Sequence, residues 1–392
     1  LPLNLKDRPD MPIVNRFAEL QDEIAGWRRD IHAHPELQFD VHRTADLVAE
    51  RLREFGLDDV ATGIGKTGVV GVIKGRSNGS GKVVGLRADM DALPIHEATG
   101  LDYASTVAGK MHACGHDGHT AMLLGAAKYL SETRNFDGTV VVIFQPAEEG
   151  GGGGRVMVED GLMEQYGIQE VYGMHNMPGL AVGEFAIRPG PMMAATDEYV
   201  IEIEGYGGHA ARPHMTVDPT VVGAQMMLAI QSIVSRNVDP VENAVVSVTT
   251  FHAGDDAFNV IPQTARLTGT TRTLSEKVRD LVERRMAEVV EHTAKAMGAK
   301  ATLHYQRNYP VLVNDGERVD FAAGVARDVA GEGRVNAEAA PLMGAEDFAY
   351  MLNVRPGAYI FTGNGETAPV HHPEYNFNDE AIPVGCSYWV RL

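Results

Sequence analysis

Near the start of the chain, apolar side chains recur at three- and four-residue spacing. Phe17, Leu20, Ile24 and Trp27 form a stripe of this kind, which predicts an amphipathic helix. Short, continuous apolar runs further on are typical of buried strands. The elements predicted here are helices over 17–33, 41–55 and 118–131 and strands over 69–74, 83–89, 140–144 and 171–174. Their alternation predicts an α/β fold with a central mixed sheet flanked by helices.

The pattern changes between about residues 188 and 305. Residues 198–204 alternate between polar and apolar side chains, as a half-exposed strand does. Asp218 and Pro219 give a cap and first-turn signal for a helix. The segment predicts strands at 198–204, 245–251, 265–271 and 301–305 and helices at 218–236 and 275–297. The resulting β-α-β-β-α-β order is that of a smaller, ferredoxin-like α+β unit.

Composition narrows the class of protein. A chain of 392 residues favours two domains. The formal net charge of −19 argues against nucleic-acid binding, which needs a basic surface, and against binding to anionic membranes. No stretch approaches the roughly 20 apolar residues of a membrane span. With two cysteines and no secretory signal in residues 1–8, we expect a cytoplasmic protein.

Five short runs carry side chains that suit a two-metal hydrolase site. They are residues 111–117, Glu148 and Glu149, residues 174–176, residues 208–209 and residues 371–373. Thiolate, imidazole and carboxylate together are ligands for a borderline or first-row divalent metal. Of the two adjacent glutamates, one could bind metal while the other handles protons. Metal-assisted amide hydrolysis needs this division of labour.

The surroundings of these runs strengthen the prediction. Glu148 and Glu149 come just after the apolar run 140–144, at the carboxyl end of a predicted strand. His175 stands at the end of the run 171–174. In open α/β sheets ligands bind at the carboxyl ends of strands, so Glu and His are expected on one rim. Five glycines at 150–154 would let the backbone approach a site closely.

Each run also has an ordinary structural explanation. A buried cysteine is usually an inert small hydrophobe, and a lone histidine is more often a hydrogen-bonded structural residue than a ligand. Cys114 could also be a nucleophile with His116 as its base. Two side chains so close in one short loop suit shared metal ligation better than that attack geometry.

The chain resembles the M20 metallopeptidase family, and within it the amidohydrolase branch that includes hippurate hydrolases and plant auxin-conjugate hydrolases. The matching runs are 29–37, 86–94, 111–119, 144–150, 207–211, 258–262, 344–348 and 371–373. They follow the family order over nearly the whole chain. The resemblance implies a catalytic domain formed by 1–187 and 306–392, interrupted by a lid or dimerisation domain at 188–305.

The resemblance also implies the metal site. Its ligands would be Cys114, His116, Glu149, His175 and His371, holding two divalent ions (Mn, Zn, Ni or Co) that Cys114 bridges. Glu148 would be the free base, and Asp89 would be an acid that orients a histidine ligand from behind the site. Family members commonly have His-Ser-Pro near the C-terminus, which aligns His371 with the ligand and leaves His372 as the alternative.

Three residues of the inserted domain match family positions near the substrate. The resemblance makes His209 a donor to the oxyanion, from its own or a neighbouring subunit, and places Asn259 nearby. Arg272 could grip a product carboxylate, or it is a surface strand charge. Glycines 205, 207 and 208 predict that the lid moves, and a homo-oligomer could form through it.

The implied activity is hydrolysis of N-acyl amino acids by metal-activated water, with Glu148 as general base. Two alternatives stay open: a dipeptidase or aminopeptidase, and an inactive binding protein that keeps the fold. The intact ligand set with a spare carboxylate disfavours the second. Met11 opens a natural-looking start, so residues 1–10 are expected to contribute nothing to the site.

Overall fold

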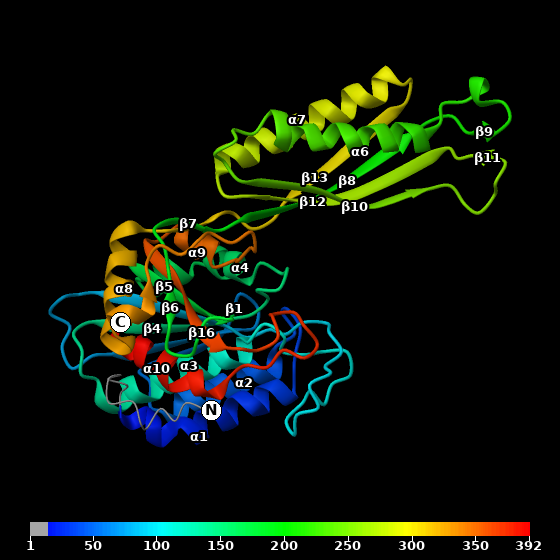
Figure 1. Ribbon diagram of the computed structural model, residues 1–392. Helices are drawn as coiled ribbons and strands as arrows, with labels where there is room; N and C mark the ends of the chain where they lie inside the picture. The colour runs from blue at the N-terminus through cyan, green and yellow to red at the C-terminus, as the bar shows by residue number, and fades with distance from the viewer. Residues whose placement is uncertain (1–14) are drawn as a thin grey trace. The chain divides into compact units, whose positions relative to one another are not determined.

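The computed structural model describes residues 15–392, whose contacts divide the chain into two units (Figure 1). The larger unit comprises the described residues up to Gly190 with Val313–Ala340 and Asp347–Leu392, and the smaller one comprises Pro191–Leu312 and Pro341–Glu346. The domain limits given above stay a prediction, and the expectation for residues 1–10 falls outside the described residues.

A mixed sheet forms the centre of the larger unit. In sheet order its eight strands are β1 (Asp59–Ile64), β2 (Gly68–Lys74), β4 (Thr139–Gln145), β3 (Val83–Asp89), β5 (Glu170–Pro178), β16 (Gly357–Gly365), β6 (Phe185–Ala186) and β15 (Val335–Asn336). The four strands from β4 to β16 run parallel, while β1, β2 and β4 pair antiparallel. The parallel strands are largely buried, as expected for a sheet covered on both faces.

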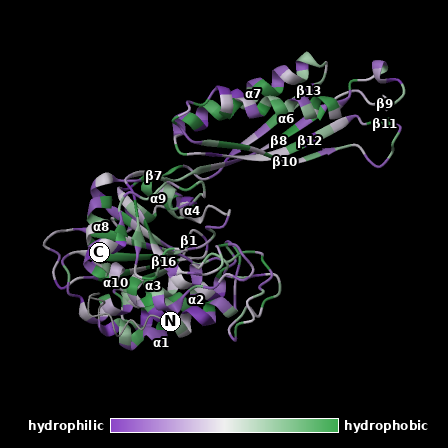
Figure 2. Cartoon of the chain, in the orientation of Figure 1, coloured by the Kyte–Doolittle hydropathy of each residue, from purple (hydrophilic) through white to green (hydrophobic). Residues whose placement is uncertain are grey.

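Helices cover this sheet. They are α1 (Asn15–Ala33), α2 (His42–Glu54), α3 (His116–Thr133), α4 (Gly153–Glu159), α5 (Leu162–Gln165), α8 (Gly316–Ala330), α9 (Ala349–Leu352) and α10 (Ile382–Arg391), with 3₁₀ turns at Glu332–Arg334 and Asp379–Ala381. The central helix α3 packs on β3, α1 and α10. Gly125 permits this close packing, because a Cβ there would lie 2.7 Å from Ile24 Cδ1 and 2.8 Å from Cys386 Sγ. Hydrophobic positions concentrate inside these layers (Figure 2).

The order of strands places a ligand site at one edge of the sheet. From β3 the chain passes to β4 on one side and then to β5 on the other, so the strand order reverses around β3. Ligands bind at such switch points, outside the carboxyl ends of the strands. The register pairs Asp89 with Gln145, so β3 and β4 end together.

The smaller unit has the predicted ferredoxin-like order. Its elements are β8 (Ala195–Glu204), α6 (Pro219–Arg236), β10 (Ala244–Ala253), β12 (Thr264–Thr273), α7 (Glu276–Ala296) and β13 (Lys300–Arg307). The sheet order is β10-β12-β8-β13, with every pair antiparallel. Asp218 caps α6 through Thr220 N, as the sequence predicted, and Ser275 caps α7 through Val278 N.

Shorter elements complete the described chain. β9 (Gly208–His209) pairs with β11 (Val260–Ile261), β7 (Gly190–Met193) pairs with β14 (Leu312–Asn314), and a 3₁₀ turn spans Pro213–Met215. The predicted fold class, an α/β protein with a central mixed sheet and a smaller α+β unit, is confirmed. Across residues 15–392, no helix is both long and apolar enough to span a membrane.

Two details of the prediction were wrong. α3 begins at His116 rather than at residue 118, because Gly115 takes the left-handed conformation (φ +93°) that turns the chain into the helix. His116 therefore belongs to the first turn of α3. His175 does not end its strand, because β5 keeps pairing with β16 up to Pro178.

Candidate metal centre

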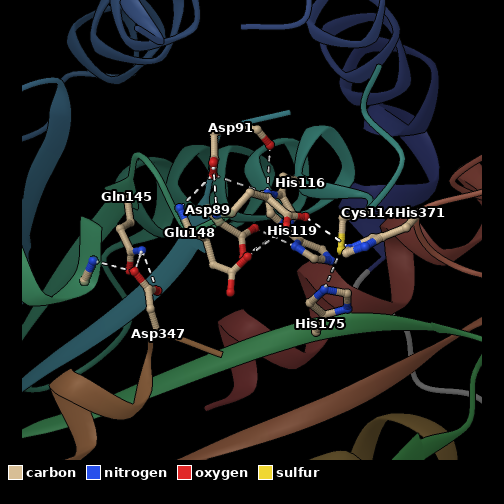
Figure 3. A network of polar contacts seen from close by, with 12 residues as sticks. Asp89, Asp91, Cys114, His116, His119, Gln145, Glu148, His175, Asp347 and His371 are labelled. Atoms are coloured by element: carbon tan, nitrogen blue, oxygen red, sulfur yellow. Dashed lines mark hydrogen bonds and ion pairs between the residues drawn. The ribbon is translucent and has the colours of Figure 1, made fainter. Parts of the chain in front are cut away.

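Four segments meet at the carboxyl edge of the central strands (Figure 3). The possible ligand atoms of Cys114, His116 and His175 lie within 4.8 Å of one another. A second triad, Cys114 with Glu149 and His371, meets the same limit. Because both triads contain Cys114, one thiolate could bridge two ions. The structure thus brings together the five residues predicted as ligands.

Backbone carbonyl groups set the tautomers of two of these histidines. His116 Nδ1 donates to Asp91 O at 2.8 Å, and His175 Nδ1 donates to Asn176 O at 2.6 Å. Since a carbonyl oxygen only accepts, each ring in its neutral form carries its proton on Nδ1 and can offer the lone pair of Nε2 to a metal ion. His116 Nε2 is buried and has no hydrogen-bond partner among the described residues. An unpaired buried nitrogen is costly, and a metal ion would satisfy it.

The His371 segment is fixed by its backbone. His371 has φ +67°, a strained value for a residue with a side chain, and its N–H donates to Ala113 O at 2.7 Å. Its Nε2 lies 3.3 Å from Glu149 Oε1, and contacts with Cys114 and Glu149 raise the pKa of His371 to about 10. His372 accepts a hydrogen bond from Glu374 N at its Nδ1 and joins neither triad. Geometry thus favours His371 over His372 as the ligand.

The glutamate pair is positioned by an aspartate that the sequence analysis left without a role. Asp91 accepts from Glu148 N at 2.9 Å and from Glu149 N at 3.1 Å, one bond to each carboxylate oxygen. Ala147, just before the pair, has φ +55°. Glu149 joins the triad with Cys114 and His371, while Glu148 Oε2 lies 3.9 Å from His116 Nε2, and the possible ligand atoms of His116, Glu148 and Glu149 also lie within 4.8 Å of one another.

A buried hydrogen-bond chain lies behind the ligands. His119 Nδ1 donates to Asp89 Oδ1 at 2.6 Å, and His119 Nε2 accepts from Asn176 N at 3.0 Å. The Asn176 side chain donates to Cys114 O at 2.6 Å and accepts from Tyr375 OH at 2.7 Å. The chain therefore fixes the backbone on both sides of the cluster. Asp89 has the supporting position that the resemblance implied, although its hydrogen bond goes to His119 rather than to a predicted ligand.

Arg87 anchors this chain from the sheet. It donates to Asp89 Oδ2 at 2.7 Å and to Asp347 Oδ1 at 3.0 Å. Asp347 also accepts from Gln145 Nε2 and from Gly154 N, both at distances of 2.7 to 2.8 Å. Burial opposes the charge on Asp89, but His116 and Arg87 hold its pKa well below the usual range. The site thus rests on an ionised, fully buried carboxylate.

The electrostatics of the cluster suit a cation. Burial, and then Glu149, raises the pKa of the Cys114 thiol, so a metal ion would have to displace its proton. Burial opposes the charged form of His116, but Asp89 and Cys114 outweigh it and raise the pKa of His116 well above its usual value. The negative electrostatic potential that favours a proton on the His116 ring also favours a metal ion there.

Several residues that support the candidate ligands were not predicted from the sequence. They are Asp91, His119, Asn176 and Tyr375. His119 carried a signal, since it lies one helical turn after His116 and shares a face of α3 with it. Gly115 is required where these groups converge, because a Cβ there would lie 2.3 Å from Asn176 Nδ2 and 2.5 Å from Tyr375 OH.

The three residues of the smaller unit that were predicted to lie near the substrate occupy two separate places in the structure. His209 is exposed on β9, and Ala210 N donates to Asn259 O at 2.9 Å, so His209 and Asn259 are neighbours. Arg272 lies near the far end of β12, about 25 Å along the strand from β11 at roughly 3.3 Å per residue. Its guanidinium is half-buried and donates to Thr271 O at 2.9 Å. The smaller unit does not bring Arg272 together with the other two.

Comparison with known proteins places the chain in a family. It matches Peptidase family M20/M25/M40 over residues 85–392 and belongs to that family. It is 44% identical to the hippurate hydrolase of Campylobacter jejuni over 97% of this chain and 98% of the other. It is 41% identical to the N-acetyl-L-cysteine deacetylase of Bacillus subtilis, over 95% and 88%. The chain is therefore a hydrolytic enzyme that acts on amide bonds.

A solved structure supports the same placement. The YXEP protein of Bacillus subtilis, a dinuclear metal-binding peptidase of the M20 family, superposes with a TM-score of 0.82 at 36% identity. The match covers 95% of this chain and 97% of that chain. The shared fold confirms the M20 resemblance that the sequence runs indicated.

Proposed function

We propose that this enzyme hydrolyses the amide bond of N-acyl amino acids such as hippurate, releasing a carboxylic acid and an amino acid. The observation that carries this proposal is the adjacent glutamate pair, which Asp91 holds by both backbone N–H groups beside two triads that share Cys114. The 44% identity to a hippurate hydrolase supports the choice of acyl substrate.

In this proposal five side chains hold two divalent ions. They would be Cys114, His116, Glu149, His175 and His371, of which Cys114 belongs to both triads. The mixed donor set of thiolate, imidazole and carboxylate fits Mn, Zn, Ni or Co. When bound, the metals would polarise the acyl carbonyl and lower the pKa of a water molecule towards neutrality.

Glu148 carries the protons in this mechanism. It accepts the proton of the attacking water through its carboxylate and later delivers a proton to the leaving nitrogen. Its 7% exposure limits exchange of that proton with solvent, and Asp91 keeps its backbone in place throughout. No serine or cysteine nucleophile is needed, because the thiol of Cys114 serves as a ligand.

His209 is proposed to stabilise the oxyanion. Ala211 N donates to its Nδ1 at 3.1 Å, which leaves the proton on Nε2, where the ring can donate to a developing negative charge. Asn259 lies beside it, whereas Arg272 is proposed to bind the carboxylate of the amino-acid portion. One N-acyl amino acid is too short to contact both ends of β12. We therefore propose that His209 and Arg272 serve different active sites in a homo-oligomer.

Mixing two inactive variants tests this shared arrangement. Cys114→Ala lacks the metal site but keeps His209, and His209→Ala keeps the metal site. If His209 acts across the subunits of a dimer, co-refolded mixtures are expected to recover up to about a quarter of the wild-type rate, since half the dimers are mixed and one of the two sites in each is complete. Hydrolysis of hippurate is the measurement. If the mixture stays as inactive as its components, although mixed oligomers form, His209 serves its own chain.

The proposed substrate class is tested by direct comparison of substrates. Purified enzyme, reconstituted with each of the four metals, is assayed with hippurate, N-acetyl amino acids and unblocked dipeptides of matched sequence. We expect the N-acyl amino acids to have the highest kcat/KM, and chelation to abolish the activity. A preference for unblocked dipeptides would instead identify a dipeptidase. Bound metal with no turnover on either class would indicate an inactive binding protein.

A further inference from the structure

A cavity of about 390 Å³ opens beside the candidate metal centre in the larger unit. Its walls include the side chains of Leu37, Phe39, Ala92 and Pro94, and Glu149 lies in its lining. Four apolar residues next to a proposed ligand give a concave, mainly hydrophobic surface, which is typical of small-molecule sites. The role of this cavity was not indicated by the metal-binding runs.

The walls of the cavity are fixed before any ligand binds. Asp40 N donates to Leu37 O at 2.9 Å, which closes a tight turn, and Gln38 within that turn has φ +49°. Thr67 Oγ1 donates to Phe39 O at 2.9 Å. The ring of Phe39 packs against Gly151, where a Cβ would lie 3.2 Å from Phe39 Cε2. One glycine of the 150–154 run therefore makes room for this aromatic wall.

We propose that this cavity binds the acyl group of the substrate, and that Phe39 and Leu37 set the preference for a bulky or aromatic acyl group. This inference rests on the proposed function. The carbonyl under attack belongs to the acyl group, so the acyl group must lie beside the metal ligands, as this cavity does through Glu149. The volume is ample for a benzoyl group.

The amino-acid portion of the substrate fits this cavity poorly. Its carboxylate would lose water against four apolar walls, which is costly without a partner. Asp40, which also lines the cavity, would add repulsion. A cation at the Phe39 wall is Lys66, whose Nζ lies 3.9 Å from the centre of the Phe39 ring and is engaged by that aromatic face. The acyl group is therefore the occupant that the lining favours.

The test compares acyl groups on one amino acid. Phe39→Ala should lower the ratio of kcat/KM for N-benzoylglycine to that for N-acetylglycine by about tenfold, because it removes the aromatic wall that only the larger group contacts. Leu37→Trp should lower the same ratio by narrowing the cavity. Calorimetry on the metal-loaded protein should show weaker binding of benzoate to Phe39→Ala, with binding of glycine unchanged.

Controls separate this proposal from a general defect and from the proposed function. Phe321→Ala removes a half-exposed phenylalanine of α8 and should leave both substrates unaffected. The proposal is overturned if Phe39→Ala lowers both kcat/KM values equally. It is also overturned if Lys66→Met weakens the binding of glycine, because that result would show that the cavity binds a carboxylate. If the wild type hydrolyses neither substrate, the proposed function fails, and the benzoate calorimetry still decides whether the cavity binds an acyl-derived group.

Discussion

Glu148→Gln is expected to lower the turnover of an N-acyl amino acid by about two orders of magnitude or more while the enzyme keeps its metal. Glutamine preserves the size of the side chain and the backbone bond to Asp91, but it cannot accept a proton. The loss should therefore appear in kcat, with little change in KM. Steady-state kinetics on hippurate, paired with elemental analysis of the same preparation, measures both quantities.

The neighbouring glutamate is the matched control. Glu149 belongs to the triad with Cys114 and His371, and its carboxylate has a lowered pKa because His371 and His116 outweigh the burial that opposes its charge. Glu149→Gln should therefore lower the metal content, and excess metal should restore part of its activity. The roles are reversed if Glu148→Gln loses metal and regains full activity on reconstitution, while Glu149→Gln keeps both ions.

Most of the fold could be predicted from the spacing of apolar residues, because each helix or strand has to bury its own apolar side chains. The stripe of Phe17, Leu20 and Ile24 is buried in α1, and the apolar run in β4 lies between neighbouring strands, so burial alone specified both elements. The places of His116 in α3 and of His175 in β5 were harder to predict. The start of α3 depends on the conformation of Gly115, and the length of β5 depends on its pairing with β16, which is distant in sequence.

Apart from His119, the supporting residues of the site could not be predicted from the sequence for the same reason. Asp91 acts by accepting two backbone N–H groups from residues 148 and 149, and such bonds leave no pattern in the chain. Tyr375 reaches Asn176 across a separation of 199 residues. The acyl cavity combines residues 37–40 with Ala92, Pro94 and Glu149, which meet only after folding. Motifs could predict the candidate ligands, but only the fold could show what holds these side chains in place.

Cys114→Ala is expected to remove most of the bound metal and reduce hydrolysis to background, because this thiol is common to both ligand triads. Its loss would remove one of the three candidate ligand atoms from each triad. Inductively coupled plasma analysis of the protein, with titration of a metal-binding dye, measures the number of ions and their affinity. Hydrolysis in the presence of excess metal shows whether any activity can be recovered.

The other cysteine provides the control for this prediction. Cys386 is fully buried in α10, where its Sγ donates to Met122 O at 3.2 Å, and it belongs to neither ligand triad. Cys386→Ala should lower the free energy of unfolding by about 1 kcal/mol, through a small cavity, and leave the metal content unchanged. Mild oxidants should likewise inactivate the enzyme through Cys114, and bound metal should protect it, because a coordinated thiolate is less available for oxidation. A Cys114→Ala protein with full metal content and full rate, beside a Cys386→Ala protein that loses both, would remove the thiolate bridge from the proposed site.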